Sequence, residues 1–249
     1  MRVVFMGTPD FAVPSLSMLH DTEDVVAVVT QPDRPKGRGH KLAASPVKEK
    51  ALELGLPVYQ PKSVREEDFQ KTLQSLKPDI ILVVAFGQIL PQSILSLPPY
   101  GCINVHGSLL PRYRGAAPIQ WSVINGEEQA GVTTMYMAKG LDSGDMLLKA
   151  SLPIQETDTY GDLIGPLSQL GAELLKDTMA QLKAGTLKRE PQDETFATYA
   201  PMIEKETGHI DWSLSCRAIR SLMPVPYTHL CSPLRNFSSS HPKKGWIFT

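Results

Sequence analysis

Asn104 and His106 are separated by a single residue at the end of an apolar stretch, and this pair is the strongest chemical signal in the chain. Side chains alternate between the two faces of a strand, so both residues should point the same way. An Asn amide can donate a hydrogen bond to an oxygen that becomes negative, while an imidazole exchanges protons near neutral pH. Together these groups suit acyl transfer. For an isolated pair, however, turn capping and backbone hydrogen bonding are the better interpretation.

The residues around this pair favour the chemical interpretation. A Ser-Leu-Leu-Pro string and a glycine-rich turn follow His106, and a second glycine-rich loop, residues 139–145, carries Asp142. A carboxylate in that position can orient an imidazole or stabilise its charge. We therefore expect Asn104, His106 and Asp142 to form one reaction centre.

Continuous apolar runs separated by turn residues predict the elements that must position this centre. Strands are expected at residues 3–6, 25–30, 79–85, 102–105, 131–137 and 146–152. Helices are expected at residues 11–20, with a cap within residues 7–10, and at 46–54, 66–76, 117–124 and 159–182. Such runs are typical of an α/β fold with a mainly parallel sheet that is covered on both faces. Sheets of this kind bind ligands beyond the carboxyl ends of their strands, where both polar loops are placed.

The last helix contains Gly165-Pro166. A proline inside a helix costs about 3 kcal/mol, so this helix should start near Leu167 or kink at the proline.

Composition favours a cytoplasmic globular protein. The chain has 249 residues, of which 42% are hydrophobic, and a formal net charge of -1, so any contact with nucleic acid must be local. Its three cysteines are widely spaced and form no CxxC pair, which argues against a disulfide framework and a zinc site. The apolar run at residues 3–6 is too short for a signal peptide or a membrane span, so we expect no membrane association. The expected state is a monomer without bound metal.

A basic segment, residues 34–48, is the one local feature that suits a polyanion. It carries five positive charges in fifteen residues without an acidic residue: Arg34, Lys36, Arg38, Lys41 and Lys48. Such a segment can bind phosphates, although a solvated surface loop explains its composition equally well.

Residues 104–115, 140–145 and 7–11 resemble the methionyl-tRNA formyltransferase family. The resemblance covers residues 1 to about 220. It extends through residues 31–35, 45–48, 84–87 and 192–195. It implies a Rossmann-like formyltransferase domain that moves a formyl group from 10-formyltetrahydrofolate to the α-amine of initiator methionyl-tRNA.

The resemblance also implies a role for each site residue. Asn104 would hold the formyl oxygen, His106 would assist proton transfer and stabilise the tetrahedral intermediate, and Asp142 would support His106. The folate pocket would be lined by Ser108, Leu109, Leu110, Pro111, Phe86, Gly87 and Leu90. The tRNA would be bound by Arg34, Lys36, Lys41 and above all Arg38, and Phe11 would contact the methionyl side chain. For Phe11 and the leucines, ordinary core packing remains the alternative.

A dinucleotide cofactor is not expected. Gly7-Thr8-Pro9 lacks the further glycines of the dinucleotide fingerprint, and no acidic residue stands at the position that would bind the ribose. We therefore expect 10-formyltetrahydrofolate as the formyl donor and no NAD.

The resemblance ends near Arg220. Members of the family continue into an OB-like β-barrel, for which too few residues remain, so this barrel is expected to be largely absent. The expected organisation is a catalytic domain at residues 1–207 and a linker with a divergent, poorly folded tail at residues 208–249. Two other functions stay open: formyl transfer to a small amine, against which residues 34–48 argue, and binding of folate or RNA without turnover.

Overall fold

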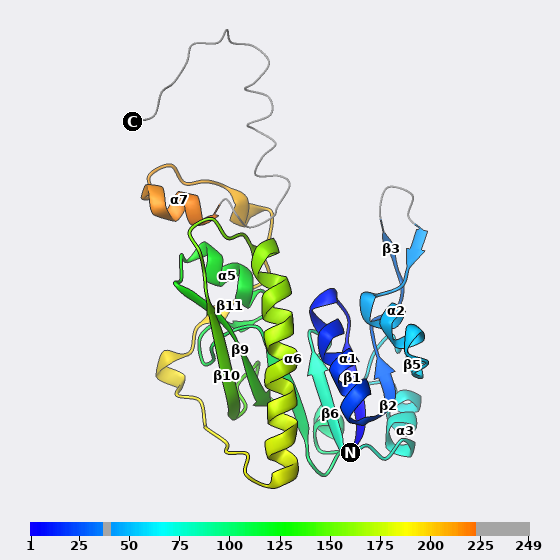
Figure 1. Ribbon diagram of the computed structural model, residues 1–249. Helices are drawn as coiled ribbons and strands as arrows, with labels where there is room; N and C mark the ends of the chain where they lie inside the picture. Colours follow the sequence, from blue (N-terminus) through cyan, green and yellow to red (C-terminus); the bar gives the residue numbers. More distant parts are fainter. Residues whose placement is uncertain (37–40, 223–249) are drawn as a thin grey trace.

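The computed structural model describes residues 1–36 and 41–222, and its centre is a seven-stranded sheet in the order β10-β9-β7-β6-β1-β2-β5 (Figure 1). The strands are β1 (Arg2–Gly7), β2 (Asp24–Val29), β5 (Val58–Tyr59), β6 (Ile80–Val84), β7 (Cys102–His106), β9 (Gln129–Tyr136) and β10 (Met146–Pro153). The first five pair in parallel, whereas β9 runs antiparallel to both β7 and β10. The predicted α/β fold with a mainly parallel sheet is confirmed.

Helices cover both faces of the sheet. One face carries α1 (Val13–Thr22), α2 (Pro46–Glu53), α5 (Pro118–Ile124) and α6 (Tyr160–Ala184), and the other carries α3 (Glu67–Ser75) and α4 (Gln92–Leu95). Alternate residues of β1 enter the two cores: Phe5 packs on the first face and Met6 on the second. Because both faces are buried, the strands are continuous apolar runs.

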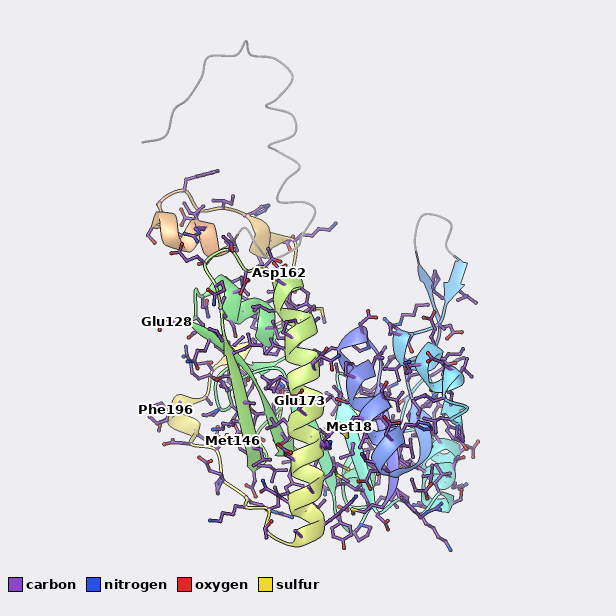
Figure 2. The ribbon with its side chains drawn as sticks, in the orientation of Figure 1. Met18, Glu128, Met146, Asp162, Glu173 and Phe196 are labelled. Carbon is purple, nitrogen blue, oxygen red and sulfur yellow. The ribbon has the colours of Figure 1, made fainter. Side chains whose placement is uncertain are left out.

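Helix α6 begins earlier than its proline suggests. Thr159 caps it: the Thr159 side chain accepts from the backbone N–H of Asp162, and the Asp162 carboxylate accepts from the backbone N–H of Thr159. This capping box fixes the first turn, so Pro166 lies inside the helix and a start near Leu167 is wrong. Figure 2 shows Asp162 at one end of α6 and Glu173 midway along it. The helix contacts α1, β9 and β10.

The first helical segment also differs from expectation. A 3-10 turn, η1 (Asp10–Ala12), precedes α1, and neither turn nor helix has a side-chain cap. The cap expected within residues 7–10 is therefore wrong, because Pro14 at the start of α1 already suits a helical first turn.

Two small sheets lie outside the main one. Strands β3 (Arg34–Lys36) and β4 (Lys41–Ala43) form an antiparallel hairpin that projects beside α2 (Figure 1). Strands β8 (Arg114–Gly115) and β11 (Tyr199–Ala200) pair in parallel. Residues 190–200, which we call the strap, run from a bridge between Glu190 and Met146 to β11. Figure 2 shows Phe196 in the middle of the strap.

The last described elements follow the strap. They are a 3-10 turn, η3 (Glu206–Gly208), and a helix, α7 (Cys216–Leu222), that contacts α5. The linker and tail expected to be poorly folded, residues 208–249, thus contain a helix, and Cys216–Leu222 has no proline or glycine to interrupt it. Residues 223–249 lie outside the described residues. Across residues 1–36 and 41–222, no helix has both the length and the apolar character to cross a bilayer.

Candidate active site

His106 is the last residue of β7 and is buried. Its Nε2 lies 2.8 Å from the carbonyl oxygen of Tyr113, and its Nδ1 lies 3.6 Å from Oδ2 of Asp142. A carbonyl oxygen only accepts, so Nε2 must carry the proton in that hydrogen bond. The other ring nitrogen, Nδ1, therefore faces the carboxylate of Asp142.

Asp142 lies on the loop between β9 and β10 in a left-handed conformation, with φ of 44°. Its Oδ2 accepts from the backbone N–H of Gly115 at 2.8 Å, and its backbone oxygen accepts from Nε2 of Gln192 at 2.7 Å. A non-glycine residue in this conformation costs of order 1 kcal/mol or more unless its surroundings hold it there. The loop is thus fixed at both its backbone and its carboxylate.

Asn104 shares a face of β7 with His106. Its neighbours Ile103 and Val105 pack into the core beneath α1 and α6, so alternation turns Asn104 and His106 toward the opposite face. Among residues 1–36 and 41–222, the structure records no hydrogen bond to the Asn104 amide. That amide is therefore available to a ligand at the carboxyl end of the strand.

The Ser-Leu-Leu-Pro segment is held by side chains beneath it. Ser108 Oγ donates to the Arg112 carbonyl oxygen at 2.6 Å. Thr133 Oγ1 donates to the Ser108 carbonyl oxygen at 2.6 Å and accepts from the Leu110 N–H at 3.2 Å. Leu110 is buried against Met135 and Met146, whereas Leu109 and Pro111 are half-buried. Sequence reasoning missed Thr133, whose signal was a polar residue in an apolar strand.

A pocket of about 510 Å³ opens at the carboxyl ends of β1, β2 and β6. Its lining includes Phe86, Gly87 and Arg34 together with residues that the sequence did not single out for function: Thr8, Pro9, Asp10, Gln31, Pro32, Pro35, Ala43, Ala44, Ser45, Pro46 and Ala85. Thr8 Oγ1 and Gln31 Nε2 both donate to the Phe86 carbonyl oxygen, at 2.9 and 3.3 Å. Gln31 directly follows the strand predicted at residues 25–30, and Thr8 lies two residues after the strand predicted at residues 3–6. A polar residue at a predicted strand end was the signal that could have identified both.

Two further residues expected at the site lie in the core. Leu90 packs among the apolar residues beneath α3 and α4, and Phe11 packs with Leu16 on the opposite face. Both are buried, as the core-packing alternative describes.

Three of the basic residues, Arg34, Lys36 and Lys41, belong to β3 and β4, whereas Lys48 lies on α2 and pairs with Asp33 at 2.6 Å. Arg34 Nη2 donates to Oε1 of Gln31 at 3.3 Å, which places its guanidinium at the pocket. Lys36 and Lys41 are backbone partners in the register of β3 and β4. Arg38 lies outside the described residues.

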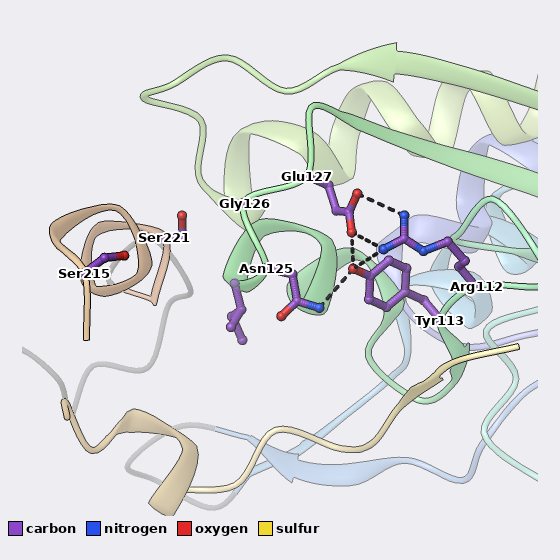
Figure 3. Close-up of a pocket in the computed structure, with 8 residues that line it drawn as sticks. Arg112, Tyr113, Asn125, Gly126, Glu127, Ser215 and Ser221 are labelled. Carbon is purple, nitrogen blue, oxygen red and sulfur yellow. Dashed lines mark hydrogen bonds and ion pairs between the residues drawn. The ribbon is translucent and has the colours of Figure 1, made fainter. Parts of the chain in front are cut away.

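A second pocket, of about 550 Å³, lies beside Tyr113 (Figure 3). The Tyr113 hydroxyl donates to Glu127 and accepts from Nδ2 of Asn125, while Arg112 pairs with Glu127 at 2.5 Å. Burial, followed by the hydrogen bond to Glu127, raises the pKa of Tyr113 above its ordinary value. The phenol therefore stays protonated at neutral pH. Tyr113 thus lines this pocket, while its carbonyl oxygen accepts the hydrogen bond from His106.

Cys102 precedes Asn104 on the same strand, yet it is not a nucleophile. Burial raises the pKa of its thiol to about 12. A thiol reacts as the thiolate, which is almost absent at neutral pH with such a pKa. Asn104 and His106 are therefore the remaining candidates on β7 for a role in the chemistry.

Comparison with known proteins places this geometry in a family. The formyl transferase family model matches residues 1–179. A methionyl-tRNA formyltransferase of Caldanaerobacter subterraneus is 57% identical over 232 residues, covering 91% of this chain and 75% of the relative. One of Acetivibrio thermocellus is 52% identical over 236 residues, covering 92% and 76%. The chain belongs to the methionyl-tRNA formyltransferase family.

Solved structures support the fold of this formyltransferase. An N-formyltransferase from Helicobacter canadensis, in complex with folinic acid and dTDP-3-aminofucose, has a TM-score of 0.71 at 21% identity, covering 90% of this chain and 80% of its own. A glycinamide ribonucleotide transformylase from Symbiobacterium toebii has a TM-score of 0.63 at 18% identity, covering 78% and 94%. At these identities the likeness concerns the fold alone.

The strap of this formyltransferase meets the site through Arg114. The side chain of Arg114 is 2% exposed and binds Glu194 with both terminal nitrogens, at 2.9 and 2.8 Å. Its Nε donates to Oε1 of Gln192 at 3.0 Å. A two-pronged pair of this kind fixes direction as well as distance.

The pair between Arg114 and Glu194 should make the stability of the formyltransferase depend on pH. The hydrogen bond from Arg114 holds the pKa of Glu194 below its ordinary value. A lowered pKa stabilises the fold above the unfolded value of about 4.3, and this contribution is lost as pH falls through the folded-state pKa. Thermal unfolding of Glu194→Gln should therefore show a lower Tm than wild type at pH 7 and a gap that closes below about pH 4.

The matched control is Glu173→Gln on the exposed side of α6. Its Tm should follow wild type across the same range of pH. A Glu194→Gln gap as large at pH 3 as at pH 7 would show that the charge of Glu194 does not stabilise the fold.

Proposed function

We propose that this chain transfers a formyl group from 10-formyltetrahydrofolate to the α-amine of initiator methionyl-tRNA. The observation that carries the proposal is identity above 50% over about nine tenths of the chain to proteins named for this reaction. The grouping of Asn104, His106 and Asp142 at the end of β7 supports it independently.

The reaction requires an exchange of bonds at one carbon atom. The amine nitrogen attacks the formyl carbon, the new N–C bond forms, and the bond from that carbon to N10 of the folate breaks. The amine gives up a proton and N10 receives one. The attacking amine must be neutral, and a reference pKa of about 8 leaves a useful neutral fraction at pH 7. A strong general base is therefore unnecessary.

The residues of β7 supply the remaining help. The Asn104 amide donates to the formyl oxygen as that oxygen becomes negative, which is the step where enzymes gain most from a fixed donor. His106 carries protons at the nitrogen that faces Asp142. Asp142 holds the ring in place and stabilises its charge.

The folate donor is assigned to the space between two segments that follow neighbouring strands. Val84 pairs with Val105, so the loops after β6 and β7 start side by side. Gly87 is exposed at the pocket after β6, and Phe86 offers its backbone there while its side chain is buried in the core beneath α3 and α4. Ser108–Pro111 would close the other side, with Thr133 fixing its backbone. This arrangement suits a flat, partly apolar ring system with polar edges.

The hairpin of β3 and β4 is assigned to the tRNA. It projects beside α2 (Figure 1), and Arg34, the first residue of β3, lines the pocket. Positive side chains near a reaction centre can bind phosphates of an acceptor strand without reading its sequence. The hairpin would thus bring the charged end of the tRNA to the Asn104 amide.

One assay with three acceptors tests the function. The purified chain is incubated with 10-formyltetrahydrofolate and, separately, methionyl initiator tRNA, an amino-sugar nucleotide and glycinamide ribonucleotide, and the products are identified by mass spectrometry. Formylmethionyl-tRNA as the main product supports the proposal. Preferential formylation of a small amine would replace the acceptor, and folate binding without any formylated product would refute the enzymatic function.

Arg38→Ala should weaken tRNA binding with little effect on the chemical step. Each phosphate contact contributes about 0.7 to 0.9 to the slope of log affinity against log salt, so the slope should fall by about that amount. KM for methionyl-tRNA is measured between 50 and 200 mM KCl, and Lys71→Ala on α3 serves as the control. Unchanged formylation and unchanged salt dependence would remove Arg38 from the tRNA-binding surface.

A further inference from the structure

Gln192 uses its whole amide to join three parts of the chain. Its Nε2 donates to the carbonyl oxygens of Asp142 and Gly144, at 2.7 and 2.8 Å. Its Oε1 accepts from Nε of Arg114 at 3.0 Å. Carbonyl oxygens only accept and the guanidinium only donates, so the amide has one orientation that satisfies all three contacts.

Arg114 fixes Gln192 from the other side. Its guanidinium is buried and is held by the two-pronged pair with Glu194 two residues along the strap. Its backbone N–H donates to the Thr198 carbonyl oxygen at 2.8 Å, so backbone and side chain of Arg114 both bind the strap. The end of the guanidinium that reaches Gln192 therefore has little freedom to move.

The same stretch of chain also reaches the Asp142 carboxylate. Gly115, the residue after Arg114, donates its backbone N–H to Oδ2 of Asp142 at 2.8 Å. A β-carbon at Gly115 would lie 2.8 Å from the Ala200 carbonyl oxygen, so the backbone of the strap packs directly against Gly115. Asp142 is thus held by its carboxylate through Gly115 and by its backbone through Gln192.

We propose that Arg114 and Gln192 are positioning residues that hold Asp142 against His106 and thereby set the geometry of the reaction centre. Neither side chain contacts His106 or the Asp142 carboxylate. They act on a loop whose left-handed backbone at Asp142 needs external support. This inference rests on the proposed formyl transfer. It adds to that reaction two positioning residues, Arg114 and Gln192, which lie 78 positions apart in the sequence.

The consequence is a loss of rate rather than of folate binding. A displacement of about 1 Å caused away from the reacting atoms can cost about a hundredfold in rate. Gln192→Leu should therefore lower kcat by about tenfold to a hundredfold and leave KM for 10-formyltetrahydrofolate nearly unchanged. Gln192→Glu should do the same, because a carboxylate keeps the contact with Arg114 but cannot donate to two carbonyl oxygens.

A double-mutant cycle separates positioning from general destabilisation. In an Asp142→Asn background, Gln192→Leu should have little further effect on kcat, because the charge that Gln192 positions is already gone. Thr195→Ala, on the same strap and bonded only to Asp193 among the described residues, is the control and should keep the wild-type kcat. Effects of Gln192→Leu and Asp142→Asn that multiply would overturn the proposal.

A second measurement does not depend on the acceptor. The NMR resonances of the His106 ring at fixed pH, assigned with a His106→Asn variant, should move in the same direction in Asp142→Asn and Gln192→Leu and stay in place in Thr195→Ala. Wild-type ring resonances in Gln192→Leu would refute the positioning role. Failure of the wild-type chain to formylate methionyl-tRNA would refute the proposed function alone, since the ring resonances still report whether Gln192 acts on Asp142.

Discussion

Asn104→Ala should lower kcat for formyl transfer by about 10²- to 10³-fold, or about 3 to 4 kcal/mol in activation free energy. The Asn104 amide has no hydrogen-bond partner among the described residues, so its removal takes away a donor that only a ligand can use. A donor to a developing oxyanion acts mainly in the transition state, so KM for the folate should change little. Single-turnover formylation and folate binding, measured separately, give the two quantities.

Asn125→Ala is the matched control for this change. Asn125 is the other asparagine in the described residues, and its amide binds the Tyr113 hydroxyl on the far side of the site. Its kcat should remain close to wild type. For Asp142→Ala we likewise expect a lower kcat and a nearly unchanged KM for the folate. Normal single-turnover chemistry in Asn104→Ala would remove Asn104 from the mechanism.

Gly144→Ala should damage both the stability and the turnover of the protein. Gly144 is buried, and a β-carbon there would overlap the Tyr136 carbonyl oxygen and lie 2.9 Å from the carbonyl carbon. The backbone cannot yield without moving the loop that carries Asp142 and losing the hydrogen bond to Gln192. Overpacking of this kind costs about 1–3 kcal/mol in the free energy of unfolding. The fall in kcat should be at least as large as that of Gln192→Leu.

Gly161→Ala separates this effect from the general consequence of adding a methyl group. Gly161 lies at the start of α6, where a β-carbon would meet only Thr159 Oγ1, at 3.4 Å. Alanine favours helix over glycine by up to about 1 kcal/mol, so this variant should be as stable as wild type or more so. Urea unfolding and kcat are measured for both variants. Wild-type behaviour of Gly144→Ala would show that the loop can move without consequence.

Local patterns were sufficient for most elements of the fold. The apolar runs of β1, β2, β6 and β7 are four to seven residues long and buried on both sides, which makes them visible without an alignment. Helix α6 was predicted at residues 159–182 and spans Tyr160–Ala184; the alternative start near Leu167 is wrong, because the capping residue Thr159 was a better guide than Pro166. A proline lowers the stability of one turn, but the packing of the following residues on β9 and β10 outweighs that loss.

The candidate site was predictable only in part, because its own residues leave a local signal in the sequence and the residues that support them do not. The relation of Asn104 to His106 follows from strand alternation, and the loop with Asp142 was recognisable by its glycines. The supports of that loop were not. Arg114 reaches Gln192 and Glu194 across about eighty residues, and no local spacing relates them. Long-range hydrogen bonds between ordinary polar residues leave no periodic signal in one sequence.

The strap changes what counts as the smallest working unit of this enzyme. The family model ends at residue 179, within α6, and residues 1–179 already contain Asn104, His106 and Asp142. A fragment designed on that boundary would keep these three residues of the candidate site and discard the partners of Arg114 at residues 192 and 194. In such a fragment the buried Arg114 guanidinium would lack its acceptors, and the loop that carries Asp142 would lack its hydrogen bonds from Gln192. Excision experiments and chimaeras should therefore take residue 200, rather than residue 179, as the earliest possible end.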